Sequence, residues 1–334
     1  MKFALSQEHR DLGRATRAAL TRFAVPNGSL RDDDVDEVVR DLGWADPTLD
    51  NLSVGVLAEE AGRALLPGSW WIMLSGAGRH LSSAAMDTPA LCWSTLPAVN
   101  DANWDGVLEG SLPDVFGVAS RPQQLLFPSL SGVIAVDLSL PGVTTIPQRD
   151  GFDPSRTAST VHFQRVTTRR LRISTDDWQQ TRTRALALLA AEATGVAQAM
   201  LEVATDHAKV RSQFGKPIGV FQAVAHPLAD CYVDIELARS AWWWAMAALD
   251  SPVMEVPARR QAVATASVLA MRCLETASSA SLQTLGAVGF TQEHSWHRHY
   301  RRAVWLRGYL SGSGPWQVLT AALTKPRAAQ GEQL

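Results

Sequence analysis

The sequence has 334 residues, with 31 lysines and arginines against 33 aspartates and glutamates and a formal net charge of −2. A chain of this length can hold more than one domain and bury large apolar cores. The balanced charge argues against partners that require a strongly basic surface, such as nucleic acids or anionic membranes. The cysteines, Cys92, Cys231 and Cys273, are odd in number and widely spaced, which disfavours both a disulfide framework and a zinc cluster.

The first residues, MKFALSQEHR, become charged early and lack the apolar core of a signal peptide. No apolar run approaches the roughly 20 residues that a helix needs to cross a bilayer. Together with the balanced charge, this pattern predicts a soluble, cytoplasmic protein without a membrane or nucleic-acid partner.

Residues 1–88 are predicted to form a helical domain. Ser6 can cap a helix that ends near Phe23, because a serine oxygen accepts a hydrogen bond from an unpaired amide of the first turn. A second helix is predicted over 54–65, ahead of Pro67, and a third over 70–81.

Residues 89–175 have a different composition. Short runs rich in β-branched and apolar residues alternate with Pro, Gly, Ser and Asp, which is typical of a small antiparallel sheet domain. These runs are residues 107–108, 125–127, 132–136, 143–146 and 160–163.

Residues 176–334 are predicted to be helical again. Apolar residues recur three and four apart from Ala185 to Val210, the pattern of a helix that buries one face. A break follows at Phe214-Gly215-Lys216-Pro217, because glycine permits an unusual turn and proline disfavours helix in the residue before it. Candidate helices cover 178–210, 220–250, 257–284 and 296–310. The fold class is therefore α+β and mainly α.

Two phrases in this region resemble the acyl-CoA dehydrogenases, flavoproteins that oxidise an acyl-CoA thioester between its α and β carbons. They are RSQFGKPIGVFQAVAHPLAD at 211–230 and QTLGAVGF at 283–290, and three N-terminal phrases are similar to the same family: FALSQEHRDL, DLGW and LAEEAGRALLPG. The resemblance implies an N-terminal helical domain (1–88), a middle antiparallel β domain (89–175) and a C-terminal four-helix bundle (176–334).

The resemblance also implies where FAD would contact the chain. In the family, the flavin ring lies between the β domain and the bundle, while the pyrophosphate and adenosine reach a dimer interface where the neighbouring subunit holds them. Eight residues of this sequence match those that hold the neighbour's cofactor, and we name them the tail-holding residues. They are Arg211, Gln213, Phe214, Phe221, Gln222, Gln283, Gly286 and Gly289.

The chemistry of these residues suits that role. The guanidinium of Arg211 offers a planar fork of donors for phosphate oxygens, and Gly286 and Gly289 let backbone approach a ligand closely. The alternative is that Phe214 and Phe221 only pack at a helix corner and that the glycines only end a helix.

The family's catalytic base is missing. Many members carry the base as a glutamate in a YEGT phrase, and the matching position here holds Leu310. Other members carry the base at the start of the helix that precedes RxxFG. The matching residue here is Ala185, or Arg184 in a shifted register. Loss of a general base costs typically 10²–10⁴ in rate, so the chain alone is not expected to run the reaction. Glu192 is a weak candidate base, and pairing with an arginine is the favoured interpretation of its mid-helix position.

The family's contacts to a subunit's own flavin ring also look eroded. The loop that matches the family's TEPxxGSD phrase reads WSTLPAVN at 93–100, and Gly312 stands where the family has a threonine. The chain therefore keeps the residues that hold a neighbour's cofactor and lacks those that seat its own.

This asymmetry predicts the non-catalytic subunit of a heteromeric, FAD-dependent acyl-CoA dehydrogenase. Its partner would be a longer catalytic subunit in a two-plus-two heterotetramer. FAD would be shared between the two kinds of subunit, and the substrate would be an acyl-CoA. Family members of this kind include enzymes of sterol side-chain and ring degradation. One alternative is a homomeric flavoenzyme with a displaced base, and another is a flavin-free structural or acyl-CoA-binding protein.

Two further patterns have weaker functional interpretations. His294, His297 and His299 form H-x2-H-x-H, but positions i and i+5 do not share a helix face and no carboxylate or cysteine is arranged with them, so a metal site is disfavoured. The Trp242–Trp244 triplet is predicted to pack in an oligomer core, with an aromatic wall beside a substrate as the alternative.

Overall fold

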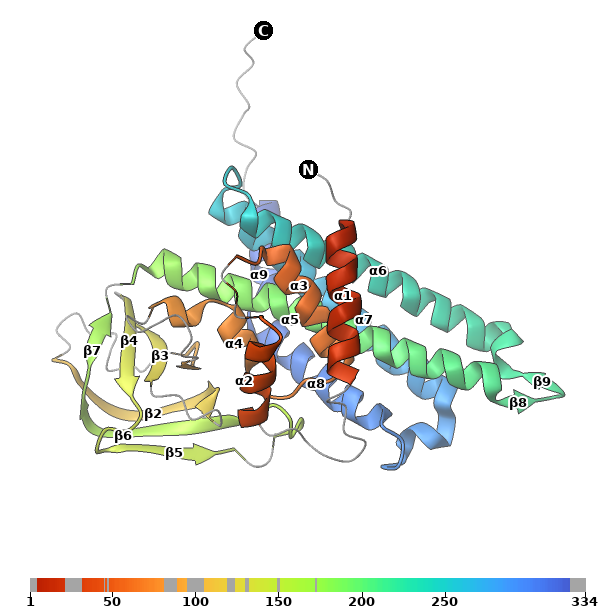
Figure 1. The fold of residues 1–334 in the computed structure, drawn as a ribbon, viewed down its shortest axis with the longest axis horizontal. Helices are drawn as coiled ribbons and strands as arrows, with labels where there is room; N and C mark the ends of the chain where they lie inside the picture. Colours follow the sequence, from red (N-terminus) through yellow and green to blue (C-terminus); the bar gives the residue numbers. More distant parts are fainter. Residues whose placement is uncertain are drawn as a thin grey trace, which may run out of the picture.

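The computed structural model describes residues 5–21, 32–44, 46, 48–80, 89–94, 105–118, 124–129, 132–148, 151–171 and 173–324. Helices come first, a β-sheet follows, and long helices complete the chain (Figure 1). This is the predicted α+β, mainly helical fold. The boundaries of the three predicted domains, 1–88, 89–175 and 176–334, stay predictions.

The N-terminal block begins with a capped helix, because the amide of His9 donates to the hydroxyl of Ser6 at 3.2 Å. Asp50 caps the third helix in the same way, accepting from the amide of Ser53 at 2.7 Å. The helix predicted over 70–81 is shorter than expected, because the hydroxyl of Ser75 bonds to the carbonyl of Ile72 and the chain leaves the helix there. The elements are α1 (Gln7–Thr21), α2 (Asp32–Asp41), α3 (Asn51–Arg63), α4 (Trp70–Leu74) and the 3₁₀ turn η1 (Ala77–His80).

Within its described residues, the middle block forms a seven-stranded sheet of order β5-β6-β2-β1-β3-β4-β7. The described neighbouring strands pair antiparallel, as predicted, apart from β1 and β3, which pair parallel. The strands are β1 (Ala90–Leu91), β2 (Val107–Phe116), β3 (Gln124–Ser129), β4 (Gly132–Asp137), β5 (Val143–Pro147), β6 (Ala158–Thr167) and β7 (Arg169–Leu171).

The C-terminal block consists of long helices, and the predicted ranges agree with them to within a few residues. A short β-hairpin lies between the first two of these helices, α5 (Thr175–Val210) and α6 (Gln222–Asp250), at the predicted break. It projects from the end of this helix pair that is farther from the sheet (Figure 1). The elements are α5 (Thr175–Val210), β8 (Ser212–Gln213), β9 (Lys216–Pro217), η4 (Ile218–Val220), α6 (Gln222–Asp250), α7 (Val256–Leu285), η5 (Gly286–Phe290), α8 (Trp296–Gly312) and α9 (Pro315–Thr324).

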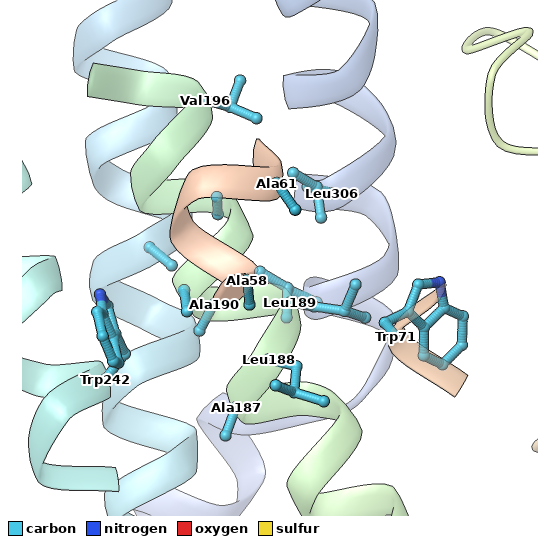
Figure 2. Close-up of a cluster of buried hydrophobic side chains, with 14 of the residues drawn as sticks. Ala58, Ala61, Trp71, Ala187, Leu188, Leu189, Ala190, Val196, Trp242 and Leu306 are labelled. Atoms are coloured by element: carbon cyan, nitrogen blue, oxygen red, sulfur yellow. The ribbon is translucent and has the colours of Figure 1, made fainter. Parts of the chain in front are cut away.

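Helix α5 forms the centre of the core, and α3 crosses it with backbone against backbone. A Cβ atom on Gly62 would lie 2.0 Å from the carbonyl oxygen of Glu192, and one on Gly195 would lie 1.8 Å from the carbonyl oxygen of Glu59. Only glycine permits so close an approach. Figure 2 shows small side chains of α3, such as Ala58 and Ala61, among the leucines and alanines of α5.

By length and composition alone, α5 could cross a membrane, but 78% of its most apolar window is buried inside the protein. It is therefore a core helix. Trp242 of α6 is likewise fully buried against α3, within 2.5 Å of where a Cβ on Gly55 would lie. The prediction of an oligomer-core role is thus wrong for Trp242, whereas Trp243 and Trp244 are partly exposed.

Candidate functional site

The first group of tail-holding residues lies on the exposed hairpin between α5 and α6. Gln213 pairs with Lys216, and the two residues between them, Phe214 and Gly215, have φ values of 54° and 80°. Two successive positive φ angles define the tight turn that suits a hairpin. This conformation is sterically unfavourable for phenylalanine, so a bulky ring is held at the tip at a conformational cost.

The ring of Phe214 is 91% exposed. It meets the ring of Phe221 edge-on with centroids 6.0 Å apart, and the ammonium of Lys216 lies 4.8 Å from the centroid of Phe221. Phe221 is partly buried and does pack at the corner, whereas Phe214 is not buried in this chain. Packing within the chain therefore explains the position of Phe221 but not that of Phe214.

Arg211 stands at the base of the hairpin with its backbone fixed. Its amide donates to the carbonyl of His207 at 2.9 Å, and its carbonyl accepts from the amide of Ile218 at 2.8 Å. The side chain is exposed, and in the described part of the chain its guanidinium has no ion-pair partner. Burial, with repulsion from Arg211 and His294, lowers the pKa of His207, which places His294 near the same end of the bundle.

The second group lies where α7 ends. Gln283 is exposed on the last turn of α7, and Gly286 ends the helix with φ 61° and ψ −138°, a conformation that favours glycine. No atom lies within 4 Å of a Cβ built on Gly286, whereas one on Gly289 would lie 2.9 Å from Leu282. Gly286 therefore leaves open space at the surface, and the small size of Gly289 serves packing inside the chain.

The remaining glutamines are also exposed. Gln222 begins α6, and Gln213 bonds through its side-chain amide to the carbonyl of Ser212 at 2.8 Å. The structure thus brings the residues of 211–222 together on one projecting hairpin and its adjoining turn, and the residues of 283–289 on one helix end.

Both positions that match a family base are apolar and packed. Leu310 on α8 is 0% exposed and Ala185 on α5 is 1% exposed. Neither can accept a proton. Arg184, the residue for the shifted register, lines a polar cavity near the start of α5.

Glu192 is held by arginines, which confirms the favoured interpretation of this residue. Its Oε1 atom accepts from Nη1 of Arg302 at 2.5 Å and from Nη2 of Arg156, and all three side chains are almost fully buried. Asp153 completes the group, accepting from Nε of Arg302 at 2.5 Å. We name Asp153, Arg156, Glu192 and Arg302 the buried ion cluster.

The buried ion cluster joins all three blocks of the fold. Arg302 donates to the carbonyl of Leu66 at 3.2 Å and to the hydroxyl of Ser155 at 2.7 Å. Burial lowers the pKa of Arg156 to about 10, with repulsion from Arg302, which leaves it protonated at neutral pH. Burial raises the pKa of Asp153, but the attraction of Arg302 and a hydrogen bond from Ser155 outweigh burial and bring it below its ordinary value.

Four aromatic rings fill the region where the N-terminal helices, the sheet and the bundle meet. Trp305 stacks on Tyr309 with centroids 5.2 Å apart, and Phe116 lies 5.5 Å from Tyr309 and 5.9 Å from Trp71. We name Trp71, Phe116, Trp305 and Tyr309 the aromatic cluster. Sequence reasoning missed it, although Tyr309 lies beside the leucine at the family's base position.

The aromatic cluster is tied to its surroundings by polar groups. The indole of Trp93 donates to the hydroxyl of Tyr309, and the guanidinium carbon of Arg156 lies 5.2 Å from the ring of Trp305. Burial raises the pKa of Tyr309, so its hydroxyl stays protonated. Of the loop 93–100, Trp93 and Ser94 are described, and residues 95–100, on which the eroded-loop prediction mainly rests, lie outside the described residues.

The histidine pattern is spread over the start of α8. Nδ1 of His297 lies 2.8 Å from the carbonyl oxygen of His294, which suits a hydrogen bond, and burial lowers the pKa of His299 to about 4. Across the described ranges, no group of three His, Cys, Asp or Glu side chains is placed to hold a metal ion.

Residues 180–323 match the sequence model of the acyl-CoA dehydrogenase C-terminal domain. This part of the chain is therefore identified as an acyl-CoA dehydrogenase C-terminal domain. Among curated relatives, acyl-CoA dehydrogenase FadE34 of Mycobacterium tuberculosis is 42% identical over 142 residues, 42% of this chain and 20% of that protein. Acyl-CoA dehydrogenase IpdE2 of the same organism is 40% identical over 116 residues, 35% of this chain and 34% of that protein. The matched segment thus spans a fifth to a third of these relatives.

Solved structures show the acyl-CoA dehydrogenase fold over nearly the whole chain. The ChsE4-ChsE5 complex from Mycobacterium tuberculosis has a TM-score of 0.77 at 20% identity, covering 98% of this chain and 100% of that chain. Butyryl-CoA dehydrogenase from Megasphaera elsdenii has a TM-score of 0.78 at 21% identity, covering 97% and 100%. The fold of the chain is therefore the one that the sequence resemblance implied.

Proposed function

We propose that this chain is the non-catalytic subunit of a heteromeric, FAD-dependent acyl-CoA dehydrogenase and holds the pyrophosphate and adenosine of FAD seated on a longer catalytic subunit. One contrast carries the proposal. The tail-holding residues are exposed at one end of the bundle, whereas aromatic side chains fill the region between sheet and bundle where the family seats the flavin ring.

The tail-holding side fits the negatively charged end of FAD. Arg211 presents a guanidinium that has no ion-pair partner among the described residues, and a planar fork of donors matches pyrophosphate oxygens. The exposed amide of Gln283 adds a neutral donor from a second helix end. The 91% exposed ring of Phe214 is an apolar surface that a neighbouring subunit or an adenine ring would cover.

The ring-seating side does not fit a flavin in this chain. Trp71 is fully buried, Phe116 is 7% exposed, and their rings pack against Tyr309. A planar three-ring group would have to displace these side chains. When bound, FAD would accept a hydride from the β carbon of the acyl group. Among the described residues, neither candidate position offers a base for the accompanying α-proton, because Leu310 is apolar and Glu192 is engaged by two arginines.

The partner that fits is a longer acyl-CoA dehydrogenase subunit in a two-plus-two heterotetramer. The ChsE4-ChsE5 complex and the Tcur3481-Tcur3483 steroid acyl-CoA dehydrogenase share the fold, with TM-scores of 0.77 each. They support a heteromeric assembly that acts on a sterol-derived acyl-CoA in lipid metabolism. The cytoplasm is the compartment that we propose for it.

Purification with and without the catalytic subunit tests this function. The chain expressed alone is expected to be colourless and to show no acyl-CoA oxidation with an artificial electron acceptor, even with added FAD. Co-expression with the longer subunit is expected to give a yellow, active complex. Flavin colour and turnover in the isolated chain would support the homomeric enzyme instead, and a colourless, inactive product under both conditions would support a flavin-free protein.

A further inference from the structure

An aromatic pair is exposed where the sheet meets the C-terminal helices. Phe152 lies in the turn between β5 and β6 and is 53% exposed, and Tyr300 lies on the second turn of α8 and is 38% exposed. Their rings meet edge-on with centroids 6.3 Å apart. Apolar surface that is contiguous across two elements and open to water is typical of a contact surface for another molecule.

Ordered neighbours hold this pair in place. On the α8 side, Tyr300 stacks on Trp296 with centroids 5.3 Å apart, and the buried indole of Trp296 donates to the hydroxyl of Ser281 at 2.7 Å. On the sheet side, Phe152 precedes Asp153, whose carboxylate belongs to the buried ion cluster. Aromatic side chains that are already ordered lose little conformational entropy on binding, so these rings are suited to anchor a partner.

Two arginines flank Tyr300 on α8. Arg298 and Arg301 are both exposed and lie three residues apart, so they are neighbours on the helix surface. Neither guanidinium has a hydrogen-bond or ion-pair partner in the described part of the chain. By contrast, Arg302 and Arg307 of the same helix are both paired with carboxylates.

The charge of these two arginines is not offset within the described residues. Glu293, the carboxylate nearest to them along the chain, forms no ion pair there. The surface therefore has local positive charge beside an apolar pair, although the whole chain has a formal net charge of −2.

We propose that Phe152, Arg298, Tyr300 and Arg301, here named the aromatic–arginine surface, bind an acidic segment of another protein that carries an apolar side chain among its carboxylates. A guanidinium presents a planar fork of donors that matches a carboxylate, and arginine clusters are a recurring means of recognising acidic motifs. The two exposed rings would cover the apolar side chain of the segment.

Other classes of partner fit the aromatic–arginine surface less well. An anionic membrane attracts clusters of about four to eight basic residues, and two arginines fall short of that number. A nucleic acid requires a basic stripe that follows its backbone. The proposal does not rest on the shared-FAD function, because no tail-holding residue takes part and no bound flavin is needed.

Fluorescence anisotropy with the full chain and a dye-labelled peptide, Glu-Glu-Phe-Glu-Glu, tests this surface. Wild type is expected to bind the peptide, and more weakly at higher salt, because salt screens exposed charges. Arg298→Glu and Arg301→Glu are each expected to weaken binding about tenfold or more, and Arg301→Lys less than Arg301→Glu, because lysine keeps the charge but lacks the planar fork. Phe152→Ala is expected to weaken binding about fivefold.

Two variants elsewhere on the surface are the matched controls. Arg14→Glu reverses the charge of an exposed arginine on α1, and Trp316→Ala removes a 58% exposed aromatic ring from α9. Both should bind the peptide like wild type. Circular dichroism verifies that each variant is folded, and if Phe152→Ala is not, the two arginine-to-glutamate variants still decide the result.

Several outcomes would overturn the proposal. They are absence of peptide binding by folded wild type, equal binding by Arg301→Glu and Arg14→Glu, and equal binding of a peptide with serine in place of each glutamate. Binding of wild type to phosphatidylglycerol vesicles that is lost in Arg301→Glu would assign the surface to a membrane instead. Self-association that is lost in the same variant would assign it to a second copy of this chain.

Discussion

The Oε1 atom of Glu192 on α5 accepts a hydrogen bond from Nη1 of Arg302 on α8 at 2.5 Å, inside the protein and without exposure of either side chain. This bond, with the one from Arg156, makes Glu192 part of the structure rather than a free base. It also links the centre of the bundle to the helix that carries Leu310.

Glu192→Gln is therefore expected to destabilise the chain by about 3–5 kcal/mol, because it leaves buried arginine charge without its partner. Glu202→Gln is the control, since Glu202 lies on the same helix, is 46% exposed and pairs with Arg63, so its loss should cost less than about 1 kcal/mol. Urea unfolding measures both. A Glu192→Gln complex of unchanged stability that loses only acyl-CoA oxidation would identify Glu192 as the base.

The close crossing of α3 and α5 gives a second prediction. Gly195→Ala places a methyl group 1.8 Å from the carbonyl oxygen of Glu59, so the helices must separate. We expect a loss of more than about 3 kcal/mol in unfolding free energy. Gly308→Ala is the control, because nothing lies within 4 Å of its Cβ and alanine favours helix by up to about 1 kcal/mol. Thermal unfolding that shows equal effects for both would contradict the described crossing.

Arg211 is expected to matter to the complex without touching the reacting atoms. Arg211→Ala should lower FAD content and activity of the purified complex while the subunits stay associated, and Arg211→Lys should rescue poorly because lysine lacks the planar fork. Gln283→Ala should weaken the same cofactor from another helix end. Lys209→Ala is the control, since Lys209 is exposed and pairs with Asp206. Full flavin occupancy in Arg211→Ala, read from absorbance, would show that Arg211 does not hold the cofactor.

His299 gives the stability a defined pH dependence. Burial lowers its pKa to about 4, with repulsion from Arg302 and Arg298. The unfolded chain, with a histidine pKa of about 6.5, therefore binds a proton that the folded chain does not, and stability is lost as pH falls from about 6.5 towards 4. By pH 5 the loss reaches about 2 kcal/mol. Urea unfolding of wild type and His299→Gln at pH 7.5 and 5 should show a smaller pH effect in the variant; equal effects would contradict the assignment.

The sequence predicted the long helices well because their apolar periodicity is local. The helix over 178–210 and the break at Phe214-Gly215 needed no knowledge of the tertiary structure. The exposed state of the hairpin was not predictable in the same way, because burial of Phe214 depends on what packs against it. The helix predicted over 70–81 was too long, since the bond between Ser75 and Ile72 competes with helical hydrogen bonding.

The candidate site was only partly visible in the sequence. Pairing of Glu192 with an arginine was predicted from its apolar helix face, but Arg156 and Arg302 lie 36 and 110 residues away and could not be named. The aromatic cluster was missed because Trp71, Phe116 and Tyr309 come from three separate blocks. Contacts over such sequence distances are set by the fold as a whole.

The amount of flavin in the assembled complex tests the central claim most directly. Each pair of this chain with a complete subunit contains two potential sites, and only the one whose ring is seated on the partner should be filled, because aromatic side chains occupy the other. FAD released on denaturation, read against a subunit ratio from native mass spectrometry, is therefore expected to be one per heterodimer and two per two-plus-two tetramer. One FAD for every chain in the complex would mean that this chain seats its own flavin and would contradict the account.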